Sequence, residues 1–306
     1  MKEENWKQKL TEIAQDIVFE EPMKEHTSFK IGGPAEAFIR ASSTEEIGRV
    51  VSFCKQQEIP FLVMGNGSNM LVSDKGIRGV VLQVGDQMKA CRAEGNLLWA
   101  QAGILLSALS NAALRAGLSG IEFAAGIPGT LGGGIYMNAG AYGGELKDVI
   151  KSVTYLDEEG IIRTCPAEEM GFGYRKSIFS GRSMTILECT MQLNPDEPEL
   201  IKGRMVDFNR RRSDKQPLSM PSAGSTFKRP EGYFAGKLIQ DAGLMGYQLG
   251  GAQVSEKHAG FVVNAGDATA ADVLALIEHI QHTVQDKFGV HLEPEVKLIG
   301  EQECNL

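Results

Sequence analysis

Residues 126–141 read Gly-Ile-Pro-Gly-Thr-Leu-Gly-Gly-Gly-Ile-Tyr-Met-Asn-Ala-Gly-Ala, and this stretch decides the fold class. It carries no charged side chain and is too rich in glycine to fill a hydrophobic core. Glycine lets a backbone turn tightly and lets its N–H groups approach a ligand closely. A run of N–H donors leading into a helix suits an anion, most often a phosphate. A membrane span is the other interpretation of an uncharged stretch, but Pro128 and the scarcity of large aliphatic residues disfavour it.

A second glycine loop, Gly65-Asn-Gly-Ser-Asn69, follows a short apolar strand. It begins like a Rossmann fingerprint, but Met70 stands where the third glycine belongs and no amphipathic helix follows. Its backbone N–H groups, the Ser68 hydroxyl and the asparagine amides can enclose a pyrophosphate. A plain hairpin turn, which Asn-Gly favours, explains the same residues. Two such loops in one chain favour a bound dinucleotide.

The remaining pattern predicts three α/β units, ending near residues 80, 195 and 290. Helical periodicity predicts helices over residues 5–17, 47–57, 107–116, 199–212 and 270–288, and the helix over 199–212 is expected to be polar. The second is preceded by a capping box, Ser43 to Glu46, and the last by Thr269 with an apolar face that ends at Phe288. Strands are expected over residues 35–40, 60–64, 80–84, 97–102, 152–156, 161–164, 185–193 and 295–299. The last strand has no neighbouring partner and is expected to return to an earlier layer.

Composition and charge argue against several classes of protein and of binding site. The chain has 306 residues and a net charge of −8, whereas a general nucleic-acid binder needs a basic face. The first ten residues are charged and lack an apolar core, so no secretory signal is expected. His279 and His282 lack further ligands, so no metal site is expected. The cysteines are odd in number and share no short spacing, which fits free thiols in a reducing cytoplasm; they are Cys54, Cys91, Cys165, Cys189 and Cys304.

Three further motifs have a functional and a structural interpretation. Arg210-Arg-Arg212 and Lys215 can clamp a phosphate, whereas a basic helix end favourable to the helix dipole explains the same run. Residues 174–179 place a cation between aromatic residues, and residues 222–230 place a hydroxyl on a glycine turn. Neither motif supports a catalytic role by itself.

Taken together, these segments resemble the UDP-N-acetylenolpyruvoylglucosamine reductase (MurB) family. The matches follow the order of the family along nearly the whole chain, and they are Thr27–Gly33, Gly65–Asn69, Gly126–Gly134, Asn138–Ala141, Tyr174-Arg175, Ala223–Ser225, Ala235–Ile239 and Glu293–Val296. The glycine loops alone are shared by many flavin oxidases, so the joint match carries the resemblance.

The resemblance implies an α+β fold, with a two-subdomain FAD-binding fold of the vanillyl-alcohol-oxidase (PCMH) type and a C-terminal α/β substrate-binding domain. The expected boundaries are 1–80 for FAD-binding subdomain 1, joined by a C-terminal strand within 291–306, then 81–197 for subdomain 2 and 198–290 for the substrate domain.

The activity that the resemblance implies is an NADPH-driven reduction of UDP-N-acetylglucosamine enolpyruvate to UDP-N-acetylmuramate, for peptidoglycan synthesis, with non-covalent FAD. Hydride passes from flavin N5 to the enolpyruvyl C3. By the family match, Arg175 holds and polarises the substrate carboxylate, Glu295 assists the same developing charge in its protonated form, and Ser225 gives a proton to C2.

The resemblance also assigns binding residues. Those for the cofactor are Gly65, Asn66, Gly67, Ser68, Asn69, Gly126, Ile127, Pro128, Gly129, Thr130, Gly132, Gly133, Asn138, Gly140 and Ala141. Those for the substrate are Tyr174, Lys215, Gly224, Lys228 and Arg229.

One departure from the longer members of the family is expected to matter. Only Ser180–Ser183 separates Phe179 from the next strand, so the chain resembles the shorter, type II class that lacks a tyrosine lid segment. We expect a monomer in the bacterial cytoplasm, with neither nucleic acid nor membrane as partner. Two rivals stay open: a small-alcohol oxidase of the same fold, and a non-catalytic module that binds a nucleotide sugar or flavin.

Overall fold

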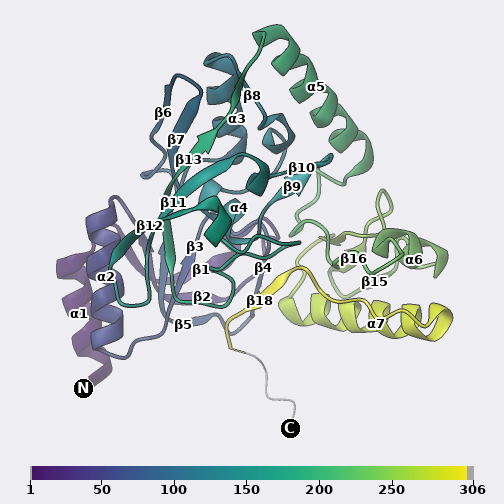
Figure 1. Ribbon diagram of the computed structural model, residues 1–306. Helices are drawn as coiled ribbons and strands as arrows, with labels where there is room; N and C mark the ends of the chain where they lie inside the picture. Colours follow the sequence, from purple (N-terminus) through teal and green to yellow (C-terminus); the bar gives the residue numbers. More distant parts are fainter. Residues whose placement is uncertain (1, 302–306) are drawn as a thin grey trace. The chain divides into compact units, whose positions relative to one another are not determined.

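The computed structural model describes residues 2–301 (Figure 1). Cys304 and the end of the predicted C-terminal segment 291–306 therefore lie outside the described residues. The chain divides into two units. The first comprises Met1–Val18, Phe38–Asn66 and Val80–Arg212, and the second comprises Phe19–Ala37, Gly67–Gly79 and Ser213–Leu306. No helix within residues 2–301 is long and apolar enough to cross a membrane.

A four-stranded sheet has the order β1-β2-β5-β3. Its strands are β1 (Ile17–Pro22), β2 (Pro34–Arg40), β5 (Ile77–Gln83) and β3 (Phe61–Met64). β3 and β5 run parallel, with Phe61 opposite Val80. The strands predicted over 35–40, 60–64 and 80–84 are thus confirmed, because β-branched and apolar runs favour a pleated, buried surface.

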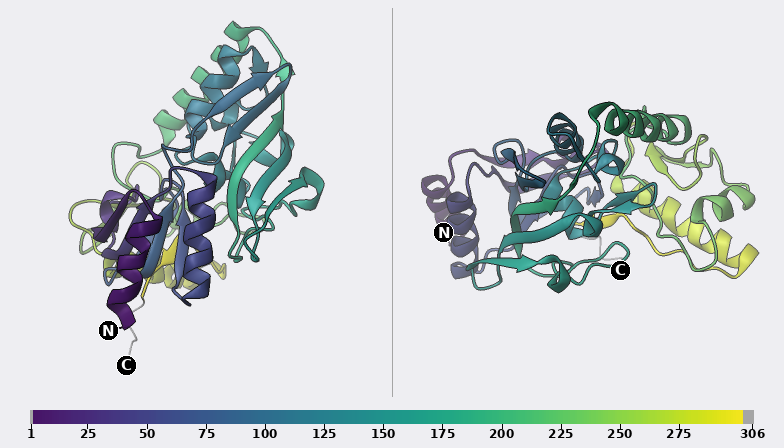
Figure 2. Two further views of the ribbon diagram at one scale, coloured as in Figure 1. Left: turned by 90° about the vertical axis from the view of Figure 1, so that its left-hand side faces the viewer. Right: turned by 45° about the horizontal axis from the view of Figure 1, so that its top comes forward.

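Helices α1 (Lys2–Ile13) and α2 (Thr44–Gln56) lie side by side in the first unit (Figures 1 and 2). The helix predicted over 5–17 is too long, because Ile17 begins β1. α1 ends at Ile13, and just before β1 the carbonyl oxygen of Asp16 accepts the N–H of Arg40 at 3.0 Å while its carboxylate pairs with the same residue at 3.1 Å. Pairing with a distant strand thus outweighs the local helical pattern.

Half of the capping box predicted for α2 is wrong. The Ser43 hydroxyl accepts the N–H of Glu46 at 3.2 Å, as expected. The carboxylate of Glu46, however, accepts the N–H groups of Ser42 at 2.7 Å and of Gln15 at 2.8 Å. Burial raises the pKa of Glu46, but these hydrogen bonds and the one from the Ser42 hydroxyl outweigh it, so the pKa lies below the usual value. The buried charge thus ties the start of α2 to the end of α1.

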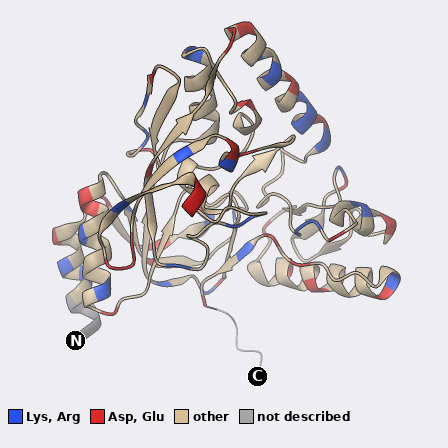
Figure 3. Ribbon diagram, in the orientation of Figure 1, with Lys and Arg blue, Asp and Glu red and all other residues tan. Residues whose placement is uncertain are grey.

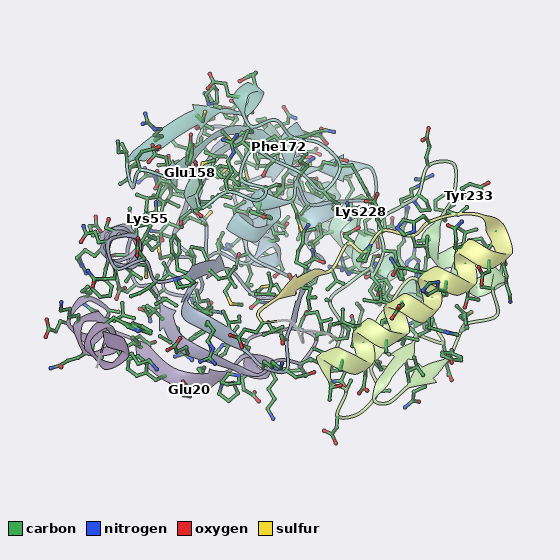
Figure 4. All side chains as sticks on the ribbon, turned by 90° about the horizontal axis from the view of Figure 1, so that it is seen from below. Glu20, Lys55, Glu158, Phe172, Lys228 and Tyr233 are labelled. Carbon is green, nitrogen blue, oxygen red and sulfur yellow. The ribbon has the colours of Figure 1, made fainter. Side chains whose placement is uncertain are left out.

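A five-stranded antiparallel sheet, in the order β12-β11-β13-β7-β6, also belongs to the first unit (Figure 2). Its strands are β12 (Ile162–Pro166), β11 (Ile150–Leu156), β13 (Thr185–Gln192), β7 (Leu97–Gln101) and β6 (Cys91–Glu94). The predicted hairpin of β11 and β12 is confirmed, and Lys55 of α2 donates to the carbonyl oxygen of Glu158 in its turn (Figure 4).

Three more helices contribute to the first unit. The longest of them continues three residues past Arg212, where the first unit ends. They are α3 (Leu106–Arg115), the short α4 (Leu131–Tyr136) inside the glycine-rich stretch, and α5 (Pro198–Lys215). Ile201 and Met205 of α5 are buried against Ala125, just before the glycine-rich stretch. The shorter elements of the chain are η1 (Met23–Glu25), β4 (Met70–Val72), β8 (Leu118–Ser119), η2 (Glu122–Ala124), β9 (Gly140–Ala141), β10 (Gly144–Glu145), η3 (Leu146–Asp148), η4 (Ala167–Glu169) and β14 (Asn194–Pro195).

The second unit is built on helix α7 (Ala270–Phe288), which packs with α6 (Ala235–Asp241) and the sheet β15-β16-β17 around one core (Figure 1). The strands are β15 (Gln248–Leu249), β16 (Ala252–Val254) and β17 (Val262–Asn264). Thr269 and Asp272 form the capping box of α7, and Thr269 was the predicted cap. Phe288, placed on the apolar face by sequence, is 39% exposed because the buried stripe ends at Val284.

The final strand, β18 (Lys297–Ile299), pairs in parallel with β4 (Met70–Val72), so the chain end returns to an early segment of the second unit. Leu71 and Val72 are fully buried. This pairing positions Glu295, which lies two residues before the strand.

Candidate active site

The two glycine loops meet inside the first unit. A Cβ atom added to Gly65 would lie 2.1 Å from the Oγ1 atom of Thr130, so only glycine allows this approach. The carbonyl oxygen of Gly65 accepts a hydrogen bond from Gln83 of β5 at 3.2 Å. β3 therefore delivers its glycine loop directly to the start of α4, and the predicted pair of loops forms one local structure.

The N–H groups that are free to bind a ligand lie just before α4, because those in the first turn of α4 bond within the protein. In its first turn, Leu131 donates to Ile104, Gly132 to Ala102, and Gly133 to the Thr130 hydroxyl. Within residues 2–301, no hydrogen bond uses the N–H groups of Gly126, Gly129 or Thr130. Gly129 has a φ of +126°, a region that glycine alone adopts without strain. Residues 126–130 thus fit the anionic part of a dinucleotide such as FAD.

Asn138 connects the glycine-rich stretch to the loop that carries Arg175. Its side chain is 1% exposed and makes three hydrogen bonds. Its amide nitrogen donates to the carboxylate of Glu145 at 2.8 Å and to the carbonyl oxygen of Gly173 at 3.2 Å, and its amide oxygen accepts the N–H of Lys147 at 3.0 Å. Both amide hydrogens are therefore used inside the protein. Its predicted cofactor contact stays a prediction, which only its backbone or its amide oxygen can provide.

Arg175 lies in a tight turn closed by Gly173 and Lys176, whose backbone groups exchange hydrogen bonds of 3.0 and 3.2 Å. Its φ is +55°, in the left-handed region that costs a non-glycine residue about 1 kcal/mol or more. The guanidinium carbon lies 5.4 Å from the ring centre of Tyr174, which is 55% exposed. An arginine kept in this conformation is typical of a functional position.

Charge around this turn is balanced by Glu145. The hydrogen bond from Lys147, and then the one from Asn138 and the charge of Arg175, lower the pKa of Glu145 despite partial burial. Ser177 donates to the carbonyl oxygen of Tyr136 at 2.6 Å, which adds a second tie between the turn and the glycine-rich stretch. Sequence analysis did not predict these positioning contacts, because they join residues that share no local pattern.

In the second unit, backbone pairing joins the segments that carry Ser225 and Glu295. Thr226 donates its N–H to Gly260 at 2.9 Å, and its carbonyl oxygen accepts the N–H of Glu295 at 2.8 Å. The next residue, Phe227, forms an antiparallel bridge with Pro294. Gly224 turns the chain into this segment with a φ of +80°. Glu295 is a buried residue, with an exposed fraction of 7%.

Asn69 forms two hydrogen bonds with the segment that carries Glu295. Its amide nitrogen donates to the carbonyl oxygen of Glu295 at 3.2 Å, and its own carbonyl oxygen accepts the N–H of Lys297 at 3.0 Å. A residue assigned to the cofactor by resemblance therefore also positions Glu295. The unit boundary divides this loop, since Gly65 and Asn66 belong to the first unit and Gly67 to Asn69 belong to the second.

The predicted substrate cations differ in their surroundings. Lys228 pairs with Glu293 at 2.8 Å and is labelled in Figure 4, while Lys215 at the end of α5 is exposed. The Arg229 guanidinium carbon lies 4.0 Å from the ring centre of Phe234, which is 61% exposed. Arg175 and Tyr174 belong to the first unit, whereas Ser225, Glu295 and the other substrate residues belong to the second. Lys215 is one of these, although most of its helix, α5, belongs to the first unit.

Two family models match separate parts of the chain. Residues 35–166 match a model described as FAD binding domain. Residues 216–299 match the C-terminal domain of UDP-N-acetylenolpyruvoylglucosamine reductase. The first match includes both Gly65 and the 126–141 stretch, and the second includes Ser225 and Glu295.

Relatives cover almost the whole chain. UDP-N-acetylenolpyruvoylglucosamine reductase of Caldanaerobacter subterraneus subsp. tengcongensis is 52% identical over 296 residues, which is 96% of this chain and 98% of the relative. That of Clostridioides difficile is 52% identical over 287 residues, 94% of each chain. The crystal structure of the Thermus caldophilus enzyme has a TM-score of 0.79 at 36% identity, and the match covers 93% of this chain and 98% of that one.

The fold and the two glycine loops define an FAD-dependent oxidoreductase with an additional C-terminal domain, which confirms the predicted fold class. The chain belongs to the UDP-N-acetylenolpyruvoylglucosamine reductase (MurB) family. It is a reductase of UDP-N-acetylenolpyruvoylglucosamine in peptidoglycan synthesis, with FAD as cofactor and NADPH as reductant.

Proposed function

We propose that Arg175, Ser225 and Glu295 carry out the reduction. Arg175 binds and polarises the substrate carboxylate, Ser225 gives a proton to C2 of the enolpyruvyl group, and Glu295 donates a hydrogen bond to the developing charge. When bound, FAD supplies the hydride that reaches C3. The observation that carries this proposal is the backbone pairing of the Ser225 and Glu295 segments through Thr226, within the family's own C-terminal domain.

The residue types suit these roles. Hydride addition at C3 pushes negative charge through C2 into the carboxylate, and a planar guanidinium that is always charged stabilises it. The strained turn fixes the backbone of Arg175 before substrate arrives, so less freedom is lost on binding. A serine that donates a proton needs its hydroxyl near C2, and Glu295 must carry a proton at that moment to act as a donor.

We propose the cofactor and substrate contacts as the resemblance assigns them. The unused N–H groups of Gly126, Gly129 and Thr130 support a cofactor phosphate next to Gly65. Tyr174, Lys215, Gly224, Lys228 and Arg229 are proposed to contact the nucleotide sugar. The domain boundaries at residues 80, 197 and 290 are proposed on the same ground.

We further propose that the protein belongs to the shorter class without a tyrosine lid. The short connection from Phe179 to β13, which begins at Thr185, supports this proposal. A cytoplasmic monomer without nucleic-acid or membrane partners is the proposed state. The net charge of −8 supports the first of these two exclusions.

Replacement of Ser225 by alanine tests the proton transfer. NADPH should still bleach the flavin of Ser225→Ala under anaerobic conditions at close to the normal rate. Reoxidation by UDP-N-acetylenolpyruvoylglucosamine should slow by a factor of roughly 10²–10⁴, the usual contribution of a general acid. Ser219→Ala, at an exposed position in the same segment, is the matched control and should behave like the wild type. Normal reoxidation of Ser225→Ala would remove Ser225 from this role.

A further inference from the structure

Helix α5 carries four arginines, and Arg212 differs from the other three. Figure 3 shows basic residues along α5 up to its C-terminal end. Arg204 bonds to Glu122 at 2.9 Å and to Asp196, while Arg210 and Arg211 pair with Asp207 at 2.9 and 2.6 Å. Within residues 2–301 the side chain of Arg212 has no hydrogen bond and no ion pair, and its Nε atom is buried. The basic run thus contains one cation without a counterion.

Arg212 lies against the first glycine of the 126–141 stretch. A Cβ atom added to Gly126 would lie 3.1 Å from Cδ of Arg212 and 2.6 Å from Oδ1 of Asn209. Burial lowers the pKa of Arg212, and Tyr142 opposes this shift. The Arg212 side chain is half-buried and its Nε atom is fully buried. An unpaired charge held partly out of water is destabilising, and a ligand that supplies the opposite charge removes this cost.

The surroundings keep Arg212 in place. Phe208 lies one helical turn before it on the same face of α5, and its ring stacks on Tyr142 at 5.0 Å with an interplanar angle of 1°. Tyr142 directly follows the glycine-rich stretch. The helix is therefore fixed to the two ends of that stretch, through Tyr142 at one end and Gly126 at the other.

We propose that Arg212 is a cofactor-binding residue that, together with the N–H of Gly126, holds an anionic group of FAD. Five N–H donors in a planar fork suit a pyrophosphate, and equally the N1–C2=O edge of a reduced flavin ring, which gains negative charge. All the residues involved belong to the first unit, and Gly126 lies within the segment that matches the FAD binding domain, whereas the substrate-domain match begins at residue 216. The cofactor is thus favoured over the nucleotide sugar.

The affinity for FAD tests the proposal. Holoenzyme is stripped of FAD, and the dissociation constant is measured from the quenching of flavin fluorescence on titration with protein. Arg212→Ala should weaken FAD binding ten- to a hundredfold, as expected for loss of a charged hydrogen bond. Arg212→Lys should fall in between, because it keeps the charge and loses the fork. Arg211→Ala removes a 55% exposed neighbour and should stay within twofold of the wild type.

A second variant separates binding from folding. Arg212→Met removes the unpaired charge and keeps most of the side-chain volume. The FAD-free form of Arg212→Met should therefore unfold at the same or higher urea concentration than FAD-free wild type, while its FAD affinity falls. A side chain with a purely structural role would lower both.

The midpoint potential of the bound flavin identifies the anion. An unchanged potential with weaker binding assigns Arg212 to the pyrophosphate, and a lower potential assigns it to the reduced ring. An affinity for FAD and a potential that both match the wild type in Arg212→Ala would overturn the proposal. So would a change confined to the affinity for UDP-N-acetylenolpyruvoylglucosamine. Failure of the wild-type protein itself to bind FAD would count against the family function and not against Arg212.

Discussion

Asn138→Ala should destabilise the first unit more than most single substitutions, because one buried side chain serves three partners. The alanine variant leaves the carbonyl oxygen of Gly173, the N–H of Lys147 and one carboxylate bond of Glu145 without their partner. Neutral buried hydrogen bonds contribute about 1 kcal/mol each and one to a carboxylate about 1.5 kcal/mol. The φ of +46° adds about 1 kcal/mol, because asparagine tolerates this region better than alanine. The expected loss is about 4.5 kcal/mol.

Tryptophan fluorescence in urea can measure this loss for the first unit alone. The only two tryptophans, Trp6 and Trp99, both belong to that unit. All variants are compared free of FAD, because a bound cofactor would add its own binding energy to the folded state. Asn111→Ala is the matched control: its amide makes one exposed hydrogen bond on α3, and the change should cost about 0.5 kcal/mol or less.

Asn138→Gly separates the hydrogen bonds from the backbone strain. Glycine loses the same three bonds but accepts a positive φ, so it should be about 1 kcal/mol more stable than the alanine variant. Hydrogen exchange should also speed up in residues 173–181, since the turn around Arg175 loses its tie to the glycine-rich stretch. A loss below about 1 kcal/mol in Asn138→Ala, or an alanine variant as stable as the glycine one, would refute this account.

Two further predictions concern the first unit. Gly65→Ala should weaken FAD binding at least tenfold because its Cβ meets Oγ1 of Thr130, and Thr130→Ala in the same chain should restore part of the affinity; a double variant no better than Gly65→Ala would contradict this. Burial raises the pKa of Glu122, but hydrogen bonds from the backbone, Ser119 and Arg204 outweigh it, so its folded pKa lies below the usual value. Its contribution to stability is then complete above about pH 5 and is lost as the pH falls through the folded pKa. Urea midpoints of Glu122→Gln should accordingly depend less on pH between about 5 and 3 than those of the wild type, and equal pH dependence would exclude this role.

Local patterns predicted much of the fold. The hairpin of β11 and β12, the capped start of α7 and the strand β3 before the Gly65–Asn69 loop all follow from periodicity and turn residues that lie close together in sequence. The errors occur where distant partners decide the outcome. Ile17 joins β1 because Asp16 bonds to Arg40, and Glu46 bonds to Gln15 in place of the N–H of Ser43.

The site follows the same rule. Resemblance to a family named Ser225 and Glu295, but only the structure shows that Thr226 and Asn69 position them. The unpaired state of the Arg212 side chain had one signal in the sequence. Asp207 lies three and four residues before Arg210 and Arg211, which is the reach of a helical ion pair, and five before Arg212, which is beyond it.

The pairing of β4 with β18 has a consequence for synthesis of the chain. β4 leaves the ribosome roughly 225 residues before its partner. At about 5–20 residues per second, this strand waits for roughly 10–45 s with its edge unpaired. An apolar edge such as Leu71 and Val72 can meanwhile join another nascent chain, so chaperone binding during translation should concentrate on this early segment.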